Sequence, residues 1–357
     1  MIAPTVAQAV VAWQKVHGRN SLPWQNTTDP YRVWLSEIML QQTQVRTVLG
    51  YFARFTARLP TVADLADASQ DEVMGLWSGL GYYSRARNLH RCAQMVVTQH
   101  GGQFPRQADV LQSLPGIGRS TAAAIASLCF GERVAILDAN VKRVLTRLLA
   151  FEGDLALAAQ ERALWQAAGE LLPSAQDGAK AMARYTQGMM DLGATVCVAR
   201  NPACHVCPLQ NRCQAHAQQR MADFPVRSRK LKRSAQSLWL LWAQDAIGAV
   251  WLQRRPAPGI WAGLHCLPVF DSAPQLRAAL PAPLRKRVLD GPAFVHVLTH
   301  KDLHLHPCQL LLKTGQALPD IDGGWIPAAH WPALGLPAPV RTLLAQKYVL
   351  RDGLGGR

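Results

Sequence analysis

The sequence predicts a chain of two parts, a mainly α-helical region over the first two-thirds and a smaller α+β domain after it. Three observations support this. Apolar residues recur at helical spacing in successive segments as far as residue 213, without an alternating strand pattern before residue 230. Strand-like apolar runs follow at 238–242, 249–253 and 294–300, separated by Gly and Pro turns. A basic stretch with no clear period lies between the two parts.

The chain length of 357 residues also favours two domains. We expect a helical domain over 1–213, a basic linker over 214–235, an α+β domain over 236–345 and a tail over 346–357. The last five residues of the tail are rich in glycine, and we expect them to be disordered.

The helical pattern can be followed segment by segment. The first helix is predicted over 5–17, and the second begins at Asp29-Pro30, where proline occupies the first helical position. The second helix extends through Leu40. Further amphipathic segments lie at 44–58, 61–75, 84–100, 107–113, 119–130, 139–151, 158–172 and 178–193.

Charge indicates the kind of partner. The chain has 38 Lys and Arg against 23 Asp and Glu, a net charge of +15. Such a basic protein is attracted to polyanions, of which nucleic acid is the first candidate; a basic surface kept for solubility is the alternative. No run of 18 apolar residues and no signal-peptide pattern is present, so we expect a cytoplasmic, nucleoid-associated protein without a membrane partner.

A tight hairpin between two helical segments is predicted at Leu114-Pro-Gly-Ile-Gly118. Gly116 and Gly118 permit a positive φ and close approach of another backbone, with Ile117 between them. The helix that follows begins with free N–H groups, which is the geometry of an anion site.

Two carboxyl groups stand out. Glu37 lies among large apolar residues and shares a helical face with Val33, Leu40 and Gln41, so it could point into a cleft; a solvent-facing helical Glu is the alternative. Asp138 precedes a helical pattern and fits an N-cap. A helix N-terminus keeps a carboxylate ionised, which is the state needed to stabilise a developing cation.

Two polar segments suit contacts with nucleic acid. Gln41, Gln42 and Thr43 form an amide-rich patch able to donate and accept hydrogen bonds at base edges. The glycine-flexed loop 79–83 carries Tyr82, which suits stacking on bases; a packed aromatic turn is the alternative.

The cysteine cluster predicts a metal site. Four of the eight cysteines fall within 17 residues in a C-x6-C-x2-C-x5-C pattern. Without an export signal, this clustering favours a metal over disulfides. The spacing alone leaves zinc and a [4Fe–4S] cluster open, whereas the single CxxC pair in one proline-containing loop favours the cluster. The four residues are Cys197, Cys204, Cys207 and Cys213.

The hairpin, the acid at Asp138 and the cysteine pattern together resemble the endonuclease III superfamily of DNA glycosylases. Within it, the segments 22–24, 34–45, 79–83 and 189–194 resemble the MutY-type adenine DNA glycosylases. The resemblance implies a helix-hairpin-helix glycosylase domain with a [4Fe–4S] loop at about 197–213. This sequence departs from the family pattern at Ala139, where the family often has glycine. We expect alanine to be accommodated there if its φ is negative.

The resemblance also implies roles for residues. Glu37 would be the general acid that protonates adenine N7, and Asp138 would stabilise the sugar cation as a transient covalent adduct. Asn140 would orient Asp138 or the water, while Trp24 and Leu40 would line the adenine pocket. Gln42 and Tyr82 would act as wedges in the duplex, and Gly116, Ile117 and Gly118 would hold backbone phosphate.

The position of Ser120 distinguishes two classes of glycosylase. Bifunctional members of the superfamily place a lysine there to form a Schiff base, so serine favours a monofunctional enzyme. A bifunctional glycosylase and lyase acting on damaged pyrimidines is the alternative activity. A non-enzymatic DNA-binding or iron–sulfur scaffold is a third possibility, in which Glu37 and Asp138 are ordinary helix residues.

The second domain resembles the Nudix-like C-terminal domain of the same family, through the segments 253–256 and 259–264. The paired glutamates of a Nudix box are missing from 270–275, so we expect recognition without pyrophosphate hydrolysis. The resemblance implies that Thr299 and His300 inspect 8-oxoguanine opposite the adenine. The expected partner is double-stranded DNA with A:8-oxoguanine or A:G mispairs, bound by a monomer, with a replication clamp as a further candidate.

Overall fold

The computed structural model describes residues 4–25, 27–228 and 232–346, whose contacts divide into two units. The first unit contains the described residues up to Asp67 together with 88–228, and the second contains 68–87 together with 232–346. Nearly all of the predicted tail, 347–357, lies outside the described residues. No helix in the described ranges is long and apolar enough to cross a membrane.

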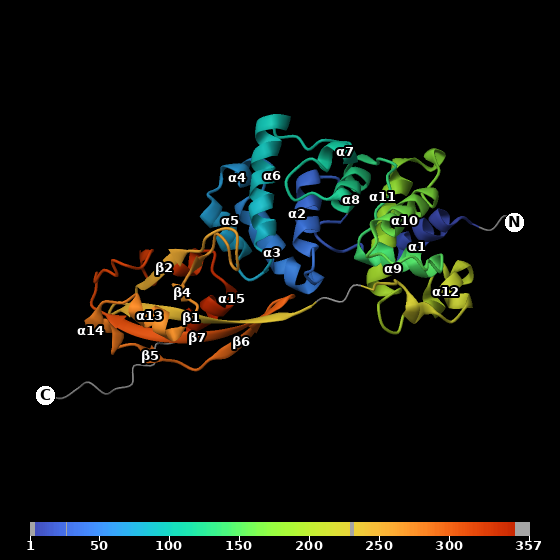
Figure 1. Cartoon of the computed structure of the whole chain (residues 1–357). Helices are drawn as coiled ribbons and strands as arrows, with labels where there is room; N and C mark the ends of the chain where they lie inside the picture. Colours follow the sequence, from blue (N-terminus) through green and yellow to red (C-terminus); the bar gives the residue numbers. More distant parts are fainter. Residues whose placement is uncertain (1–3, 26, 229–231, 347–357) are drawn as a thin grey trace. The chain divides into compact units, whose positions relative to one another are not determined.

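The first unit is helical, as the sequence predicts (Figure 1). Its helices are α1 (Val6–His17), α2 (Pro30–Leu40), α3 (Val45–Arg58), α4 (Val62–Asp67), α7 (Ala108–Leu111), α8 (Arg119–Phe130), α9 (Ala139–Leu148), α10 (Ala158–Glu170), α11 (Gly178–Thr195) and α12 (Gln214–Ala217), while α6 (Ser84–His100) has its first turn in the second unit. Short 3₁₀ turns occur at Ala175–Asp177, Cys204–Val206, Gln210–Arg212 and Met221–Asp223.

Side-chain caps fix where the helices that carry the site begin. The Asp29 carboxylate accepts a hydrogen bond from the Tyr31 N–H, and Pro30 is the first residue of α2. The Asp138 carboxylate accepts from the Val141 N–H at 2.7 Å and caps α9. Both caps therefore set the register of a helix that presents an acidic side chain to the cavity described below.

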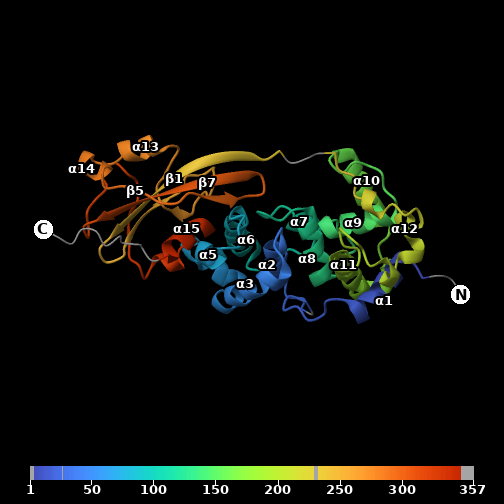
Figure 2. The same cartoon turned by 90° about the horizontal axis from the view of Figure 1, so that it is seen from below.

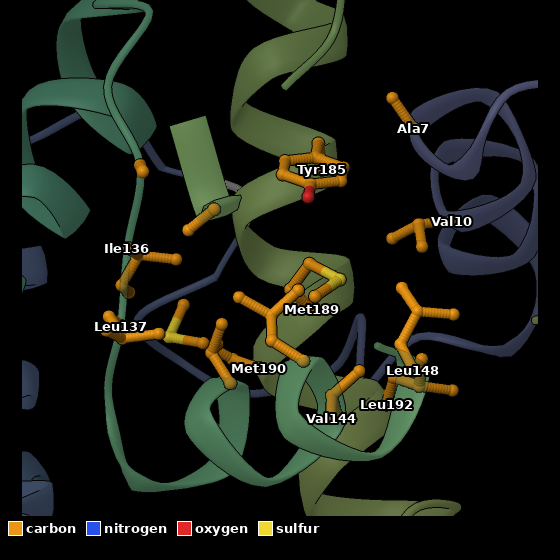
Figure 3. Packing of buried hydrophobic residues seen from close by; sticks show 14 of the residues in the cluster. Ala7, Val10, Ile136, Leu137, Val144, Leu148, Tyr185, Met189, Met190 and Leu192 are labelled. Atoms are coloured by element: carbon orange, nitrogen blue, oxygen red, sulfur yellow. The ribbon is translucent and has the colours of Figure 1, made fainter. Parts of the chain in front are cut away.

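The core of the first unit forms around α11, which packs against α1, α8 and α9. Tyr185 and Met189 of α11 meet Val10 of α1 and Val144 of α9 in one buried cluster (Figure 3). At Gly193, an added Cβ would lie only 2.6 Å from the Cβ of Asn140. Glycine here lets α11 approach the first turn of α9 closely, which fixes the position of Asn140 and of the cap before it.

The second unit is built on an eight-stranded sheet with the order β3-β2-β1-β7-β5; β4, β6 and β8 pair with β1, β7 and β2. The long strands β1 and β7 are parallel, and the other pairs are antiparallel. The strands are β1 (Ser234–Asp245), β2 (Val250–Arg254), β3 (His265–Cys266), β4 (Val269–Phe270), β5 (Leu289–Asp290), β6 (Phe294–Val297), β7 (Lys301–Leu312) and β8 (Gly324–Ile326).

Helices cover both faces of this sheet (Figure 2). One face packs against α15 (Ala338–Ala345) and the other against α13 (Ala273–Ala278) and α14 (Ala282–Arg285). A 3₁₀ turn at Trp331–Ala333 precedes α15. The sequence predicts this α+β class correctly. The first strand begins at Ser234, earlier than the expected apolar run 238–242 and within the stretch expected to be linker.

The segment 68–87, which contains α5 (Gln70–Trp77), is held within the second unit. Arg254 donates to both oxygens of Asp71, at 2.6 and 2.8 Å. The Tyr83 hydroxyl donates to the Leu336 carbonyl at 3.0 Å. The loop with Tyr82 is thereby attached to the same unit as the predicted 8-oxoguanine-recognition residues.

Candidate active site and cluster site

A cavity of about 850 Å³ in the first unit gathers most of the predicted catalytic and pocket residues. Its wall is formed by the end of α2, the residues after it, the start of α8 and the start of α9. A volume of this order accommodates a nucleotide-sized group. The predicted residues that line it are Trp24, Glu37, Leu40, Gln41, Gln42, Thr43, Ser120, Asp138 and Asn140.

Glu37 faces the cavity from the third turn of α2. Burial first, and then the negative charge of Asp138, raise the pKa of its carboxyl group to about 7, while the charge of Arg19 lowers it. In the described part of the chain no hydrogen-bond donor is bound to this carboxyl group. Glu37 therefore resides where a carboxylic acid keeps its proton near neutral pH.

Asp138 is in a different environment. Burial raises the pKa of its carboxyl group, but the N–H groups of Val141 and Asn140 and the charge of Arg143 lower it. These donors bind the ionised form of Asp138, whereas Glu37 has none. Of these two carboxyl groups, Glu37 is therefore the one that keeps its proton more readily.

Asn140 and Arg143 join the active site to the cysteine loop. The Asn140 amide lies 3.5 Å from the Asp138 carboxylate. Arg143 donates to Asn140 Oδ1 at 2.8 Å and to the main-chain oxygens of Gly193 at 2.6 Å and Cys197 at 2.7 Å. One guanidinium group thus fixes the first turn of α9 relative to the end of α11 and the first cysteine.

Ser120 lies on the first turn of α8, where its Oγ accepts a hydrogen bond from the Leu137 N–H at 3.3 Å. It lines both the main cavity and a neighbouring one of about 490 Å³. Lys142 lines the neighbouring cavity and is ion-paired with Glu161. Among the described residues, no lysine lines the main cavity.

The hairpin has the expected turn at Gly116, whereas Gly118 has a φ of −84° and does not use the left-handed conformation. The Ile117 N–H donates to the Leu114 carbonyl at 3.1 Å, and Gly116 has a φ of 79°. A positive φ at the third position of such a turn is the conformation that glycine adopts at no steric cost. Gly118 then precedes α8 without a side-chain cap, which leaves N–H groups of the first turn free for an anion.

Gln42 and Tyr82 share an unusual backbone. Both are non-glycine residues with a positive φ, 56° at Gln42 and 48° at Tyr82, and both side chains are exposed. Such conformations cost free energy and are concentrated at functional sites. The two predicted wedges thus lie on strained turns.

Ala139 has a negative φ, so alanine fits at this position, where the family often has glycine.

Thr299 and His300 form the tip of the hairpin between β6 and β7, where the Leu298 N–H donates to the Lys301 carbonyl at 2.8 Å. Both are exposed. The Thr299 hydroxyl shares a short hydrogen bond with the Tyr82 hydroxyl. This contact brings together two residues that the sequence places more than 200 positions apart.

The four cysteines line one further cavity, and none of them forms a disulfide. Within the described ranges, no three His, Cys, Asp or Glu side chains are arranged to hold a single metal ion. Four thiols around a cavity fit a polynuclear cluster better than a zinc ion, whose ligands converge on one centre. Arg147 donates to Cys197 Sγ at 3.5 Å and to the Val198 carbonyl at 2.7 Å.

Several polar residues at these sites were not predicted. Arg19 lines the main cavity and donates to the buried Asp191 carboxylate through Nε at 2.7 Å. The two are 172 positions apart, so no local pattern connects them. Arg143 and Arg147 do carry a signal, since they follow Asn140 at successive helical turns and so share its face of α9.

Comparison with known proteins agrees with this geometry. Residues 35–169 match the HhH-GPD superfamily of base excision DNA repair proteins, residues 197–213 the iron–sulfur binding domain of endonuclease III, and residues 238–346 the NUDIX domain. The fold is similar to that of a thermostable thymine-DNA glycosylase, with 27% identity and a TM-score of 0.52, over 59% of this chain and 95% of that one. The fold and site therefore define a helix-hairpin-helix DNA glycosylase of base excision repair that carries a [4Fe–4S] cluster.

The relatives give the family within this class. The adenine DNA glycosylase of Buchnera aphidicola subsp. Acyrthosiphon pisum is 34% identical over 95% of this chain and 96% of its own. That of Homo sapiens is 43% identical over 58% of this chain and 38% of its own. The chain belongs to the adenine DNA glycosylase family and is an adenine DNA N-glycosylase.

Proposed function

We propose that this enzyme removes adenine opposite 8-oxoguanine, and also opposite guanine, by hydrolysis without a lyase step. The observation that carries the proposal is the pair of unlike carboxyl groups in one cavity. Glu37 has a pKa of about 7 and no donor bound to it, whereas Asp138 is held by N–H groups as an N-cap. Two carboxyl groups with opposite protonation are what cleavage of a glycosidic bond requires.

The first step requires adenine outside the duplex, because its N-glycosidic bond is out of reach within the base stack. Trp24 and Leu40 line the cavity that would receive the base. Protonated Glu37 then donates its proton to adenine N7, which turns a poor leaving group into a neutral one. Trp24 is buried against Phe52, so its ring is fixed before substrate arrives.

Ionised Asp138 stabilises the positive charge that develops on the sugar, as a transient adduct at C1′. Asn140, oriented by Arg143, holds Asp138 or the attacking water in place. After adenine leaves, Glu37 accepts a proton from the water that completes hydrolysis. We assign Cys197, Cys204, Cys207 and Cys213 as the cluster ligands; the cluster supplies a rigid support for α9, since hydrolysis requires no electron.

The monofunctional assignment is supported by Ser120, which occupies the position expected of a Schiff-base lysine. A serine hydroxyl cannot form an imine with the sugar aldehyde. The lysine to test as an alternative source of the imine is Lys142, which lines the adjoining cavity and forms an ion pair with Glu161. Borohydride trapping on a duplex with A:8-oxoguanine should give little covalent product, and Lys142→Met should release adenine at the wild-type rate. A strong trapped product that Lys142→Met abolishes would establish the bifunctional alternative.

Recognition of 8-oxoguanine is assigned to the β6–β7 tip with Tyr82. The Thr299 hydroxyl can donate or accept at the N7 and C8 edge of the base, and the Tyr82 bond orients it. Arg233 supports the turn by donating to the Thr299 carbonyl at 3.1 Å. His300 completes the tip, and the missing Nudix glutamates leave the domain without a pyrophosphatase site.

The specificity test compares four duplexes, with A opposite 8-oxoguanine, G, C or T, under single turnover. We expect release to be fastest opposite 8-oxoguanine. Thr299→Val should reduce the preference over A:G by up to about tenfold, since a single hydrogen bond contributes about 0.5–1.5 kcal/mol. Thr314→Val, in an exposed turn of the same unit, is the matched control. Equal rates on all four duplexes would contradict the assigned specificity.

We further propose the DNA contacts, the domain bounds, the oligomeric state and the cellular location. Gln41, Gln42 and Thr43 contact the duplex around the extruded base, and Gly116, Ile117 and Gly118 hold a backbone phosphate. We assign the glycosylase domain to 1–213, the linker to 214–235 and the recognition domain to 236–345. The enzyme acts as a monomer at the nucleoid in the cytoplasm, and a replication clamp is its candidate protein partner.

A further inference from the structure

A histidine lies in the wall of the cluster cavity. His216 is the third residue of α12, the short helix whose N-cap is Cys213. Its side chain lines the same cavity as the four cysteines. The Nδ1 atom is buried and has no hydrogen-bond partner among the described residues. A buried polar atom left without a partner costs free energy unless a bound group satisfies it.

The protonation of the ring follows from its other nitrogen. His216 Nε2 lies 3.1 Å from Nε2 of Gln210. In this orientation of the Gln210 amide its nitrogen faces the ring and donates, which assigns His216 Nε2 as the acceptor without a hydrogen. In a neutral imidazole the single N–H is then at Nδ1, which is the orphaned atom. Gln210 thus fixes the tautomer that presents a donor inside the cavity.

The group that the four cysteines of this cavity would hold is the iron–sulfur cluster, whose sulfide and thiolate sulfurs are hydrogen-bond acceptors. We propose that His216 Nδ1–H donates a hydrogen bond to a sulfur of the [4Fe–4S] cluster and so adjusts its reduction potential. Arg147, which donates to Cys197 Sγ at 3.5 Å, supplies a donor at another sulfur. His216 is a positioning and tuning residue, not a ligand, and its role does not depend on which mispair the enzyme repairs.

The direction of the effect follows from charge. Reduction adds negative charge to the cluster, and a donor stabilises the more negative state. Removing the donor should therefore lower the midpoint potential. We expect His216→Leu to change the ratio of oxidised to reduced cluster about tenfold at a fixed electrode potential, which for one electron is ~59 mV.

The experiment is protein-film voltammetry of the full-length protein with its cluster, with iron content measured on each sample. His216→Asn places an amide N–H where Nδ1 stands and should restore most of the potential. His205→Leu is the matched control, because His205 is exposed on the same loop and does not line the cavity. Gln210→Leu removes the donor that fixes the His216 tautomer. It should shift the midpoint potential less than His216→Leu does.

Magnetic resonance of the oxidised wild-type protein gives a second test that needs no variant to fold. With ¹⁵N-labelled histidine, we expect a weak nitrogen coupling to the cluster and an exchangeable proton coupling that D₂O removes. Absence of both couplings would overturn the proposal. So would an unchanged potential in His216→Leu, or an equal shift in His205→Leu, which would indicate a general effect of the loop.

Discussion

Replacing Glu37 by Gln should abolish most activity and, at the same time, make the protein more stable above neutral pH. The substitution keeps the size of the side chain and removes its ionisation. General acid catalysis of this kind contributes about 10²–10⁴-fold, so adenine release should fall by that factor. The two effects have one origin, the burial that raises the pKa of Glu37 to about 7.

The stability change can be worked from that pKa. A carboxyl group with a pKa of 4.5 in the unfolded chain and about 7 in the fold binds a proton more tightly when folded. Its ionised form therefore destabilises the fold, fully above the folded pKa of about 7 and not at all below the unfolded pKa of 4.5. The difference in pKa corresponds to ~3 kcal/mol at pH 8. Gln avoids this cost, and each 1 kcal/mol raises Tm by about 2–4 °C in a domain of this size.

The assay has two parts. Thermal unfolding of wild type and Glu37→Gln is followed from pH 4.5 to 8, with Glu170→Gln as control because Glu170 is exposed on α10. The Tm advantage of Glu37→Gln should grow with pH and vanish near pH 4.5. In single-turnover cleavage, the wild-type rate should decline about tenfold per pH unit above pH 7. Glu37→Gln with near wild-type activity, or with no Tm advantage at pH 8, would refute the assigned environment.

Three further variants test other parts of the site. Asp138→Asn keeps an oxygen that can cap α9, so duplex binding measured by fluorescence anisotropy should persist while adenine release is lost; persistent turnover would disprove its role. Tyr82→Phe removes the partner of Thr299 and should lower the 8-oxoguanine preference severalfold in competition between A:8-oxoguanine and A:G duplexes, whereas an unchanged ratio would make this bond irrelevant to recognition. Arg147→Met removes donors to Cys197 Sγ and the cysteine loop, so iron should be lost faster during dialysis; equal retention would show that these bonds do not secure the cluster.

Local signals explain why most of the fold could be predicted. Asp29-Pro30, Asp138 and the Leu114–Gly118 hairpin each fix a backbone conformation through their own chemistry, and the structure shows a helix start or turn at each. The single helix predicted over 61–75 is wrong in one respect. The Ser69 side chain accepts a hydrogen bond from the Glu72 N–H and caps a second helix, α5. The apolar pattern over 61–75 therefore belongs to two helices, α4 and α5.

Long-range contacts account for what could not be predicted. The inclusion of 68–87 in the second unit depends on pairs such as Arg254 with Asp71, which are 183 positions apart. The same holds for Tyr82 with Thr299 and for Arg19 with Asp191. The sequence points to Tyr82 and to Thr299 separately, each through its own motif. No pattern of spacing in the sequence predicts that the two side chains are in contact. The raised pKa of Glu37 likewise comes from burial by several elements, of which α2 is only one.

The most direct test of the account is the product analysis of a single turnover on a duplex with A:8-oxoguanine. Free adenine and the DNA strand are quantified together before any alkali treatment. The account predicts one adenine released per strand, an intact strand with an abasic site, and much slower release from A:T. Strand cleavage that keeps pace with adenine release, or release from A:T at the same rate, would contradict the proposed hydrolysis by Glu37 and Asp138 at a mispair selected through Thr299.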